Sequence, residues 1–388
     1  MEAILGTCTL PELAKRKSFK WRTYPPDVLP AFVAEMDFTV AEPIADAVRS
    51  ALVIGDTGYA HVGELGEVFA EFATERLGWR PRPDWVFAVP DVMTGIAEVL
   101  LAATPHGSGV VINPPVYGPF FFRLEQCGRR IVEAPLRRGQ DGSYALDPDA
   151  LDRALAAPGV SAYLLCSPHN PLGLVWDREQ LLAVADACLR HDVLLLVDEI
   201  HAPLVLPGAT FVPFATLDHP MALRAMVFSS ASKGWNLAGL KCGVAVAASA
   251  EHADLLAERW EALLASHLGV LASVAAFTQS TDWLDAVVAQ IDHNRRLLGD
   301  LLRERLPQVR YLPGQASFLA WLDCGGLGLG DDPAAAFLER GRVALSSGAN
   351  FGSQGAGFAR LNIGTSPELL TEAVRRMALA VAEGSEPG

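Results

Sequence analysis

Residues 229–243 read SSASKGWNLAGLKCG and place one lysine, Lys233, among small polar residues directly after an apolar run. A lysine amine attacks carbonyl compounds once its pKa is lowered, for example by neighbouring cations. Ser230, Ser232 and Lys241 add two hydroxyls and a second cation, a set suited to a phosphate group. Judged from this stretch by itself, Lys233 could also be a solvated surface lysine. The sequence has no GxxxxGK[ST] phosphate-binding loop.

Two more polar clusters follow apolar, strand-like runs. In CSPHNPLG (166–173) two prolines and a glycine predict a rigid turn that holds Asn170, although such an Asn can also cap its own backbone. In VDEIH (197–201) Asp198 ends an apolar run, where an unpaired carboxylate is costly and a cationic ligand atom would serve as partner. A helix cap and a metal ligand are alternatives for Asp198, but apart from His201 it has no neighbouring set of His or Asp ligands, so we expect no metal site.

Taken together, these clusters contain the groups that a protein needs to hold pyridoxal 5′-phosphate (PLP). The lysine would carry the cofactor aldehyde, the carboxylate would keep the pyridine nitrogen protonated, and the hydroxyls with the second cation would anchor the phosphate.

The elements that must position these residues alternate between strand and helix. Short apolar runs predict strands at 86–89, 109–113, 162–166, 194–197, 225–229 and 244–247. Helical patterns lie between them, for example at 95–103 and 178–191. Strands that are apolar on both faces predict a mostly parallel sheet covered by helices, whose ligands bind beyond the carboxyl ends of the strands.

The pattern changes after Trp283. A long helix over 285–306 leads to strand-like runs at 310–312, 318–321 and 357–363, with a further helix at 333–341. We therefore predict a large α/β domain over residues 46–282, with a seven-stranded sheet. A smaller α+β domain would combine residues 1–45 with residues 283–388.

Composition excludes several classes of protein. The 388 residues are 51% hydrophobic and carry a net charge of −14, which argues against a nucleic-acid partner. The six scattered cysteines form no CxxC pair and predict free thiols in a cytoplasmic protein. Residues 262–281 lack charged residues but hold His267, Gln279 and several hydroxyls, so we expect a helix buried between domains or subunits and no membrane span.

At the level of motifs, the chain resembles the fold-type I PLP-dependent enzymes of the class I/II aminotransferase family. Within that family it is most similar to the MalY/PatB-type cystathionine β-lyase (C–S lyase) branch. Seven motifs carry the resemblance along nearly the whole chain and in the family's order: LPAFVAEMDF (29–38), TGYAHVG (57–63), INPPVYGPFF (112–121), LLCSPHNPLGLVW (164–176), VDEIHAPL (197–204), SSASKGWNLAGLK (229–241) and NFGSQGAGFARLNIGTS (350–366).

The resemblance implies a role for each matching residue. Lys233 would bond covalently to the cofactor and act as the catalytic base, and Asp198 would pair with the pyridine nitrogen. Asn170 and His201 would lie at the phenolic oxygen, and Tyr117 would stack on the ring. Residues that would bind the phosphate are Val92 and Met93 through their backbone, Ser230, Ser232 and Lys241, and Tyr59 from a second subunit. Arg360 would clamp the substrate carboxylate, and the shared sites imply a homodimer.

Three departures from the family pattern accompany these matches. Glu35 stands in AEMDF where ADMDF is common, Asp91 lies beside the expected phosphate loop in PDVM where PGVV is common, and NPLG replaces NPTG. The first two are expected to affect substrate selection.

The resemblance implies α,β-elimination from cystathionine or related cysteine S-conjugates, which yields a thiol, pyruvate and ammonia. An aminotransferase acting on an L-amino acid is the alternative, because both reactions use the same cofactor residues. A PLP-binding regulatory protein with vestigial activity is a second alternative.

Overall fold

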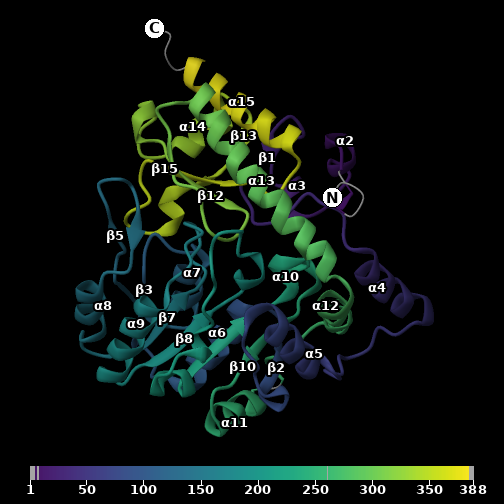
Figure 1. Ribbon diagram of the computed structural model, residues 1–388, viewed down its shortest axis with the longest axis vertical. Helices are drawn as coiled ribbons and strands as arrows, with labels where there is room; N and C mark the ends of the chain where they lie inside the picture. Colours follow the sequence, from purple (N-terminus) through teal and green to yellow (C-terminus); the bar gives the residue numbers. More distant parts are fainter. Residues whose placement is uncertain (1–4, 7, 260, 384–388) are drawn as a thin grey trace.

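A seven-stranded sheet forms the centre of the computed structural model, which describes residues 5, 6, 8–259 and 261–383 (Figure 1). The strand order is β2-β10-β9-β8-β7-β3-β4. The bounds are β2 Val86–Val89, β3 Gly109–Ile112, β4 Arg130–Glu133, β7 Val160–Cys166, β8 Leu194–Asp198, β9 Ala225–Ser229 and β10 Gly243–Val246. All neighbouring pairs are parallel except the two that involve β10. The predicted mostly parallel sheet is therefore confirmed.

Helices cover both faces of this sheet because its strands are apolar on both sides. In β7, Ala162 and Leu164 face the cluster of α6 and α7, whereas Tyr163 and Leu165 face the cluster of α8 and α9. The bounds of the helices around this sheet are α4 Glu42–Ile54, α5 Leu65–Phe72, α6 Val92–Ala103, α7 Pro119–Gln126, α8 Pro148–Leu155, α9 Arg178–Arg190, α10 Ala231–Gly234, α11 Ala250–Glu258 and α12 His267–Gln279.

A four-stranded antiparallel sheet of order β11-β12-β15-β14 lies above the large sheet in Figure 1. Its strands are β11 Arg310–Tyr311, β12 Leu319–Asp323, β14 Ser346–Ser347 and β15 Phe358–Asn362. The remaining strands are β1 Leu29–Pro30 and β13 Val343–Ala344, which pair in parallel, and β5 Arg137–Arg138 and β6 Tyr144–Ala145, which form a hairpin. The remaining helices are α2 Leu10–Leu13, α3 Phe19–Arg22, α13 Thr281–Arg305, α14 Pro333–Glu339 and α15 Pro367–Glu383.

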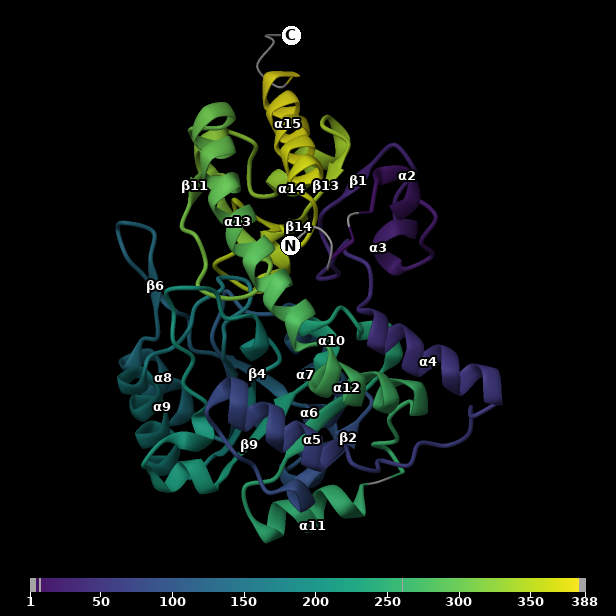
Figure 2. The ribbon, with the colours of Figure 1, turned by 45° about the vertical axis from the view of Figure 1, so that its right-hand side comes forward.

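The pairing of β1 with β13 joins the N-terminal segment to the C-terminal third of the chain, as the smaller α+β domain requires. The domain limits, 46–282 for the large domain and 1–45 with 283–388 for the small one, stay predictions. Helix α12 lies near the junction of the upper and lower parts (Figure 2), within the stretch 262–281 where we expected a buried helix. None of the described helices is long and apolar enough to cross a bilayer.

The one strand of the large sheet that the sequence analysis did not locate is β4. Its residues, RIVE, are exposed at both ends, and the strand lies at an edge of the sheet with a single partner, β3. With only two apolar residues between an Arg and a Glu, β4 lacks the continuous apolar run by which the other strands of the sheet were found.

Candidate active site

A cavity of about 300 Å³ lies at the carboxyl ends of β7, β8 and β9, where an open parallel sheet binds its ligands. It is lined by Pro90, Asp91, Val92, Met93, Tyr117, Pro119, Arg123, Cys166, Asn170, Asp198, Ile200, His201, Ser232, Lys233, Ala238, Lys241 and Cys242. Nine of the site residues predicted from the sequence line it: Val92, Met93, Tyr117, Asn170, Asp198, His201, Ser232, Lys233 and Lys241. Parallel strands bring these distant segments together because their carboxyl ends share one edge.

Lys233 lies in the short helix α10, which is separated from the polar end of β9 by Ser230 alone. Its Nζ donates a hydrogen bond to the Ala34 carbonyl at 3.0 Å. Burial and the nearby charge of Arg360 lower the pKa of Lys233 to about 8, against the opposing effect of Asp198 and Glu35. A substantial fraction of the amine is therefore neutral near pH 8, as a nucleophile or base requires.

Asp198 is the last residue of β8, and its side chain is buried. Its Oδ1 accepts a hydrogen bond from the Ile200 N–H at 3.1 Å. Burial raises the pKa of this carboxyl group to about 7, although that hydrogen bond and the charge of Lys233 oppose the shift. A cationic ring nitrogen at this position would stabilise the carboxylate, because an adjacent opposite charge favours the ionised form.

Arg360 reaches the same region from β15 of the small sheet and is buried. Its Nη1 donates to Asn170 Oδ1 at 3.2 Å, which joins the predicted carboxylate clamp to the residue predicted at the phenolic oxygen. Its Nη2 donates to the Phe32 carbonyl at 2.9 Å and to Ser346 Oγ at 3.2 Å. Burial lowers the pKa of Arg360 to about 10, so the guanidinium is still charged at neutral pH.

Tyr117 and His201 line the cavity as neutral aromatic side chains. Burial raises the pKa of Tyr117 to about 12 and lowers the pKa of His201 to about 3. The buried Nδ1 of His201 has no hydrogen-bond partner among the described residues. Both rings can therefore contact a flat ligand without adding charge.

Of the two serines predicted to bind the cofactor phosphate, one reaches the cavity and the other does not. Ser232 and Lys241 line it, and α6 begins there with Asp91 as its N-cap. Ser230 does not line the cavity, because its Oγ donates to the Cys242 carbonyl at 2.6 Å and accepts from the Ser232 N–H at 3.0 Å. The geometry therefore favours Ser232 over Ser230 as a phosphate ligand.

Asp91 is paired with Lys241 in this arrangement. Lys241 Nζ lies 2.9 Å from Asp91 Oδ2, and the Thr94 N–H donates to Asp91 Oδ1 at 2.8 Å. Burial by itself would raise the pKa of Asp91, but the contacts with Lys241 and Thr94 outweigh it and lower the pKa. A carboxylate thus lies directly beside the expected phosphate position.

Tyr59 lies outside this cavity, whereas Arg123, which was not predicted as a site residue, lines it. Tyr59 is 94% exposed and does not line the cavity of its own chain, and its role at a second subunit stays a prediction. Arg123 on α7 lines the cavity, but no motif drew attention to it. Its guanidinium makes no hydrogen bond or ion pair with the part of the chain that the structure describes. The only available signal was a basic residue one helical turn after PPVYGP.

The residues of this cavity fit PLP in kind and in placement. A lysine with a lowered pKa, a buried carboxyl group, a ring and an amide, and a cation beside a helix N-terminus line one space. The unpartnered His201 Nδ1 and Arg360 Nε are buried polar atoms that a polar ligand could satisfy. No group of His, Cys, Asp or Glu that could hold a metal ion occurs among the described residues.

The α/β fold and the groups around this cavity are those of a fold-type I PLP enzyme: a lysine, a carboxyl group, and a hydroxyl and a cation beside a helix start that can bind phosphate. Residues 59–377 match the family described as aminotransferase class I and II. The chain belongs to this family.

Individual relatives are similar over nearly their whole length. A Mycobacterium tuberculosis (strain H37Rv) protein, provisionally named a cystathionine beta-lyase, is 44% identical, and the alignment covers 98% of both chains. Cystathionine beta-lyase PatB of Bacillus subtilis is 34% identical over 92% of this chain and 93% of the relative. A PLP-bound crystal structure from Clostridium difficile 630, provisionally described as an aminotransferase, superposes with a TM-score of 0.92 at 26% identity and covers 97% of this chain and 99% of its own.

Proposed function

We propose that this protein is a PLP-dependent C–S β-lyase that cleaves cystathionine or related cysteine S-conjugates to a thiol, pyruvate and ammonia. The observation that carries the proposal is one cavity lined by a lysine of lowered pKa and a buried carboxyl group. The guanidinium of Arg360 bonds to Asn170, which lines the same cavity. The similarity to cystathionine beta-lyases over the whole chain supports the lyase in preference to other reactions of the family.

The residues of the chain divide the work as follows. When bound, PLP supplies an aldehyde that takes the substrate amine and a ring that accepts electrons from Cα. Arg360 would hold the α-carboxylate through two parallel hydrogen bonds. The Lys233 amine would take the proton from Cα, which leads to departure of the thiolate from Cβ. Asp198 would keep the ring nitrogen protonated, and Tyr117 with Asn170 would hold the ring in place.

Arg123 supports a substrate whose leaving group carries its own carboxylate, as that of L-cystathionine does. Its guanidinium lines the same cavity and has no polar partner among the described residues. S-methyl-L-cysteine lacks this second carboxylate. Replacing Arg123 by Gln should therefore raise KM for L-cystathionine more than KM for S-methyl-L-cysteine, and an equal change in both would contradict this assignment.

The reaction is tested by incubating the PLP-loaded protein with L-cystathionine and measuring pyruvate and free thiol in equal amounts. Lys233→Ala should lose both products, while a variant at the exposed Asp192, which lies away from the cavity, should keep them. No pyruvate from the unchanged protein, together with transfer of the amino group to a keto acid, would establish the aminotransferase instead. Binding of PLP without turnover of any amino acid would support the regulatory alternative.

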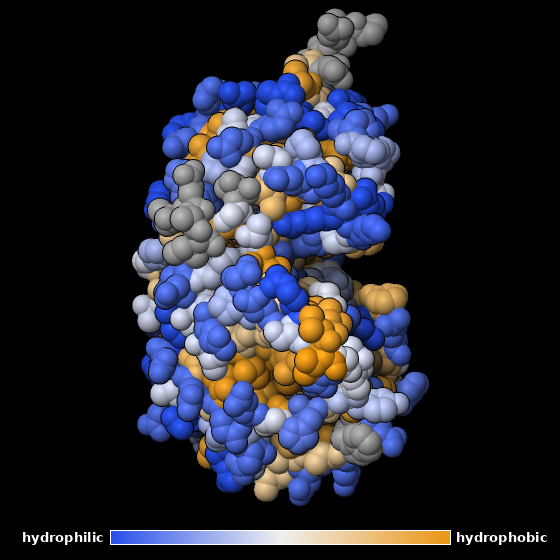
Figure 3. Space-filling model, turned by 90° about the vertical axis from the view of Figure 1, so that its right-hand side faces the viewer, coloured by the Kyte–Doolittle hydropathy of each residue, from blue (hydrophilic) through white to orange (hydrophobic). Residues whose placement is uncertain are grey.

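We propose that the active unit is a cytoplasmic homodimer with shared active sites. Val53 and Ile54 at the end of α4 are each 79% exposed, and apolar side chains gather around a hollow on this face (Figure 3). Contiguous exposed apolar patches on soluble proteins commonly mark interfaces. The six cysteines are free, which supports a reducing compartment.

Tyr59, close in sequence to this patch, would bind the phosphate of the partner's cofactor. Val53→Glu combined with Ile54→Glu should shift the sedimentation of the protein from dimer towards monomer. Tyr59→Phe should weaken PLP binding and leave sedimentation unchanged. If the unchanged protein is a monomer, the proposed homodimer is contradicted. If Tyr59→Phe binds PLP with unaltered affinity, the proposed phosphate contact of Tyr59 is contradicted.

A further inference from the structure

One short segment of the chain contacts both Lys233 and Arg360. Residues 32–38, which we call the 32–38 segment, read FVAEMDF and lie outside every described helix and strand. Lys233 Nζ donates to the Ala34 carbonyl at 3.0 Å, and Arg360 Nη2 donates to the Phe32 carbonyl at 2.9 Å. The proposed base and the proposed carboxylate clamp thus rest on two carbonyls that are only two residues apart.

Every carbonyl of the 32–38 segment accepts a hydrogen bond from a side chain. Backbone groups without a strand or helix partner need such donors when they are buried. Ser346 and Arg360 donate to the Phe32 carbonyl, Asn362 to that of Val33, and Lys233 to that of Ala34. Asn362 and Lys20 donate to the Glu35 carbonyl, and Asn236 and Arg16 to that of Met36. Arg16 also donates to the carbonyls of Asp37 and Phe38. Side chains from distant parts of the sequence therefore fix the path of this segment.

Two asparagines hold the segment on the side of the cations. Asn236 Nδ2 donates to the Met36 carbonyl at 2.9 Å, and the Met36 N–H donates back to Asn236 Oδ1 at 2.8 Å. Asn362 Nδ2 donates to the Val33 carbonyl at 2.8 Å and to the Glu35 carbonyl at 2.6 Å. Asn236 follows Lys233 by three residues and Asn362 follows Arg360 by two, so each asparagine ties the segment to the backbone that carries one cation.

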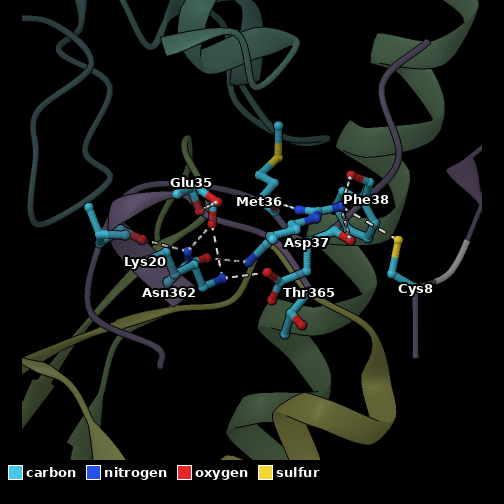
Figure 4. A network of polar contacts seen from close by, with 12 residues as sticks. Cys8, Lys20, Glu35, Met36, Asp37, Phe38, Asn362 and Thr365 are labelled. Atoms are coloured by element: carbon cyan, nitrogen blue, oxygen red, sulfur yellow. Dashed lines mark hydrogen bonds and ion pairs between the residues drawn. The ribbon is translucent and has the colours of Figure 1, made fainter. Parts of the chain in front are cut away.

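A buried ion pair also anchors the segment. Lys20 Nζ lies 2.8 Å from Asp37 Oδ1, and their side chains are 1% and 6% exposed. Lys20 also donates to the Glu35 carbonyl at 3.1 Å, as the close view of Lys20, Glu35, Asp37 and Asn362 shows (Figure 4). The segment therefore cannot slide along its own direction without losing several of these bonds.

We propose that Asn236 and Asn362 are positioning residues that act through the 32–38 segment. Asn236 acts through its two bonds at Met36, two residues beyond the Ala34 carbonyl that orients the free Lys233 amine. Asn362 acts through its bond to the Val33 carbonyl, next to the Phe32 carbonyl that accepts from Arg360. An α-amino acid has a fixed separation between its Cα–H bond and its carboxylate, so the base and the clamp need a fixed spacing. This inference rests on the roles that the proposed function gives to Lys233 and Arg360.

The geometry of each asparagine selects the variants for a test. Asn236 has a φ of 60°, a left-handed conformation that Gly adopts readily, so Asn236→Gly removes both hydrogen bonds without backbone strain. Asn362→Asp keeps the oxygen that accepts the Gly364 N–H and removes the two bonds donated to the segment. Asp192→Gly is the matched control, because Asp192 has a φ of 49° and is exposed away from the cavity.

The two variants should differ in which kinetic constant changes. Misplacement of a reacting group by about 1 Å can cost about a hundredfold in rate, so we expect losses of about tenfold to a hundredfold. In the PLP-loaded enzyme, Asn236→Gly should lower kcat with little change in KM, because it displaces the base. Asn362→Asp should mainly raise KM, because it displaces the carboxylate clamp. Asp192→Gly should change neither constant.

A second measurement needs no cofactor and no turnover. In the cofactor-free protein, an amine-acylating reagent is applied and the modification of Lys233 is followed by peptide mass spectrometry. Asn236→Gly should speed this modification several-fold, because the amine loses its fixed acceptor and gains access to water, whereas Asp192→Gly should match the unchanged protein. This result is independent of whether the bound enzyme is a lyase or an aminotransferase, and in the latter case kcat and KM are taken from amino-group transfer.

The proposal is overturned if Asn236→Gly and Asn362→Asp lower the melting temperature but leave kcat, KM and the acylation rate unchanged. It is equally overturned if both variants alter kcat and KM in the same proportion, because then the asparagines do not act on separate cations. Failure of the proposed function alone would appear as absence of pyruvate release with the acylation difference intact.

Discussion

Replacing Asp91 by Asn should make the protein bind PLP more tightly. The Asp91 carboxylate pairs with Lys241 at 2.9 Å and so competes with a phosphate for this cation, and it also repels the phosphate directly. Asn keeps the N-cap of α6, because its side-chain oxygen can still accept the Thr94 N–H. The change therefore removes a charge without removing the helix start that would bind the phosphate.

The size of the effect follows from the exposure of the pair. Lys241 and Asp91 are 58% and 34% exposed, and pairs of this kind contribute about 0.3–1 kcal/mol. A gain of that size tightens the PLP dissociation constant by about two- to fivefold. The effect should shrink at high salt, because exposed charges are screened.

The assay is a titration of cofactor-free protein with PLP, followed by absorbance at low and high salt. Lys241→Ala should weaken binding, and adding Asp91→Asn to it should give a smaller gain than in the unchanged protein, because the competition for Lys241 is gone. Weaker PLP binding in Asp91→Asn would refute the reasoning and would mean that Asp91 helps to order the phosphate site.

Two further predictions concern stability. Asp198 has a pKa of about 7 in the folded, cofactor-free protein and about 4 when unfolded, so the unfolding free energy should fall as the pH rises from about 4 through 7. Denaturant unfolding at several pH values should show a smaller decrease of the unfolding free energy with pH in Asp198→Asn. The decrease that is left should come from Glu199, whose pKa is raised to about 8. Lys20→Met leaves the Asp37 carboxyl group buried without its partner and should cost about 3–5 kcal/mol in the same assay.

Each of these stability predictions has a control. An unchanged pH profile in Asp198→Asn would show that this carboxyl group does not titrate in the stated range. Lys20→Met combined with Asp37→Asn should recover part of the lost stability, because the unpaired charge is gone. No recovery would mean that Lys20 acts mainly through its bond to the Glu35 carbonyl.

The sequence predicted the sheet and much of the cavity, because both depend on local patterns. Apolar runs that end in polar residues located β7, β8 and β9 and with them Asn170, Asp198 and Lys233. The carboxyl ends of parallel strands meet at one edge, so the order of elements was sufficient to bring these residues together. The exposed edge strand β4 was missed because it has no continuous apolar run.

Contacts between distant segments were decided only by the tertiary structure. The bonds from Lys233 to the Ala34 carbonyl and from Arg360 to the Phe32 carbonyl join residues that no local pattern relates. No local pattern predicts the hydrogen bond from Ser230 Oγ to the Cys242 carbonyl either, and this bond turns the hydroxyl away from the expected phosphate. The sequence by itself thus determined which chemical groups are present and which strand ends carry them. The packing of the small sheet and the 32–38 segment onto those ends decided how the groups are oriented, because orientation depends on partners far apart in the chain.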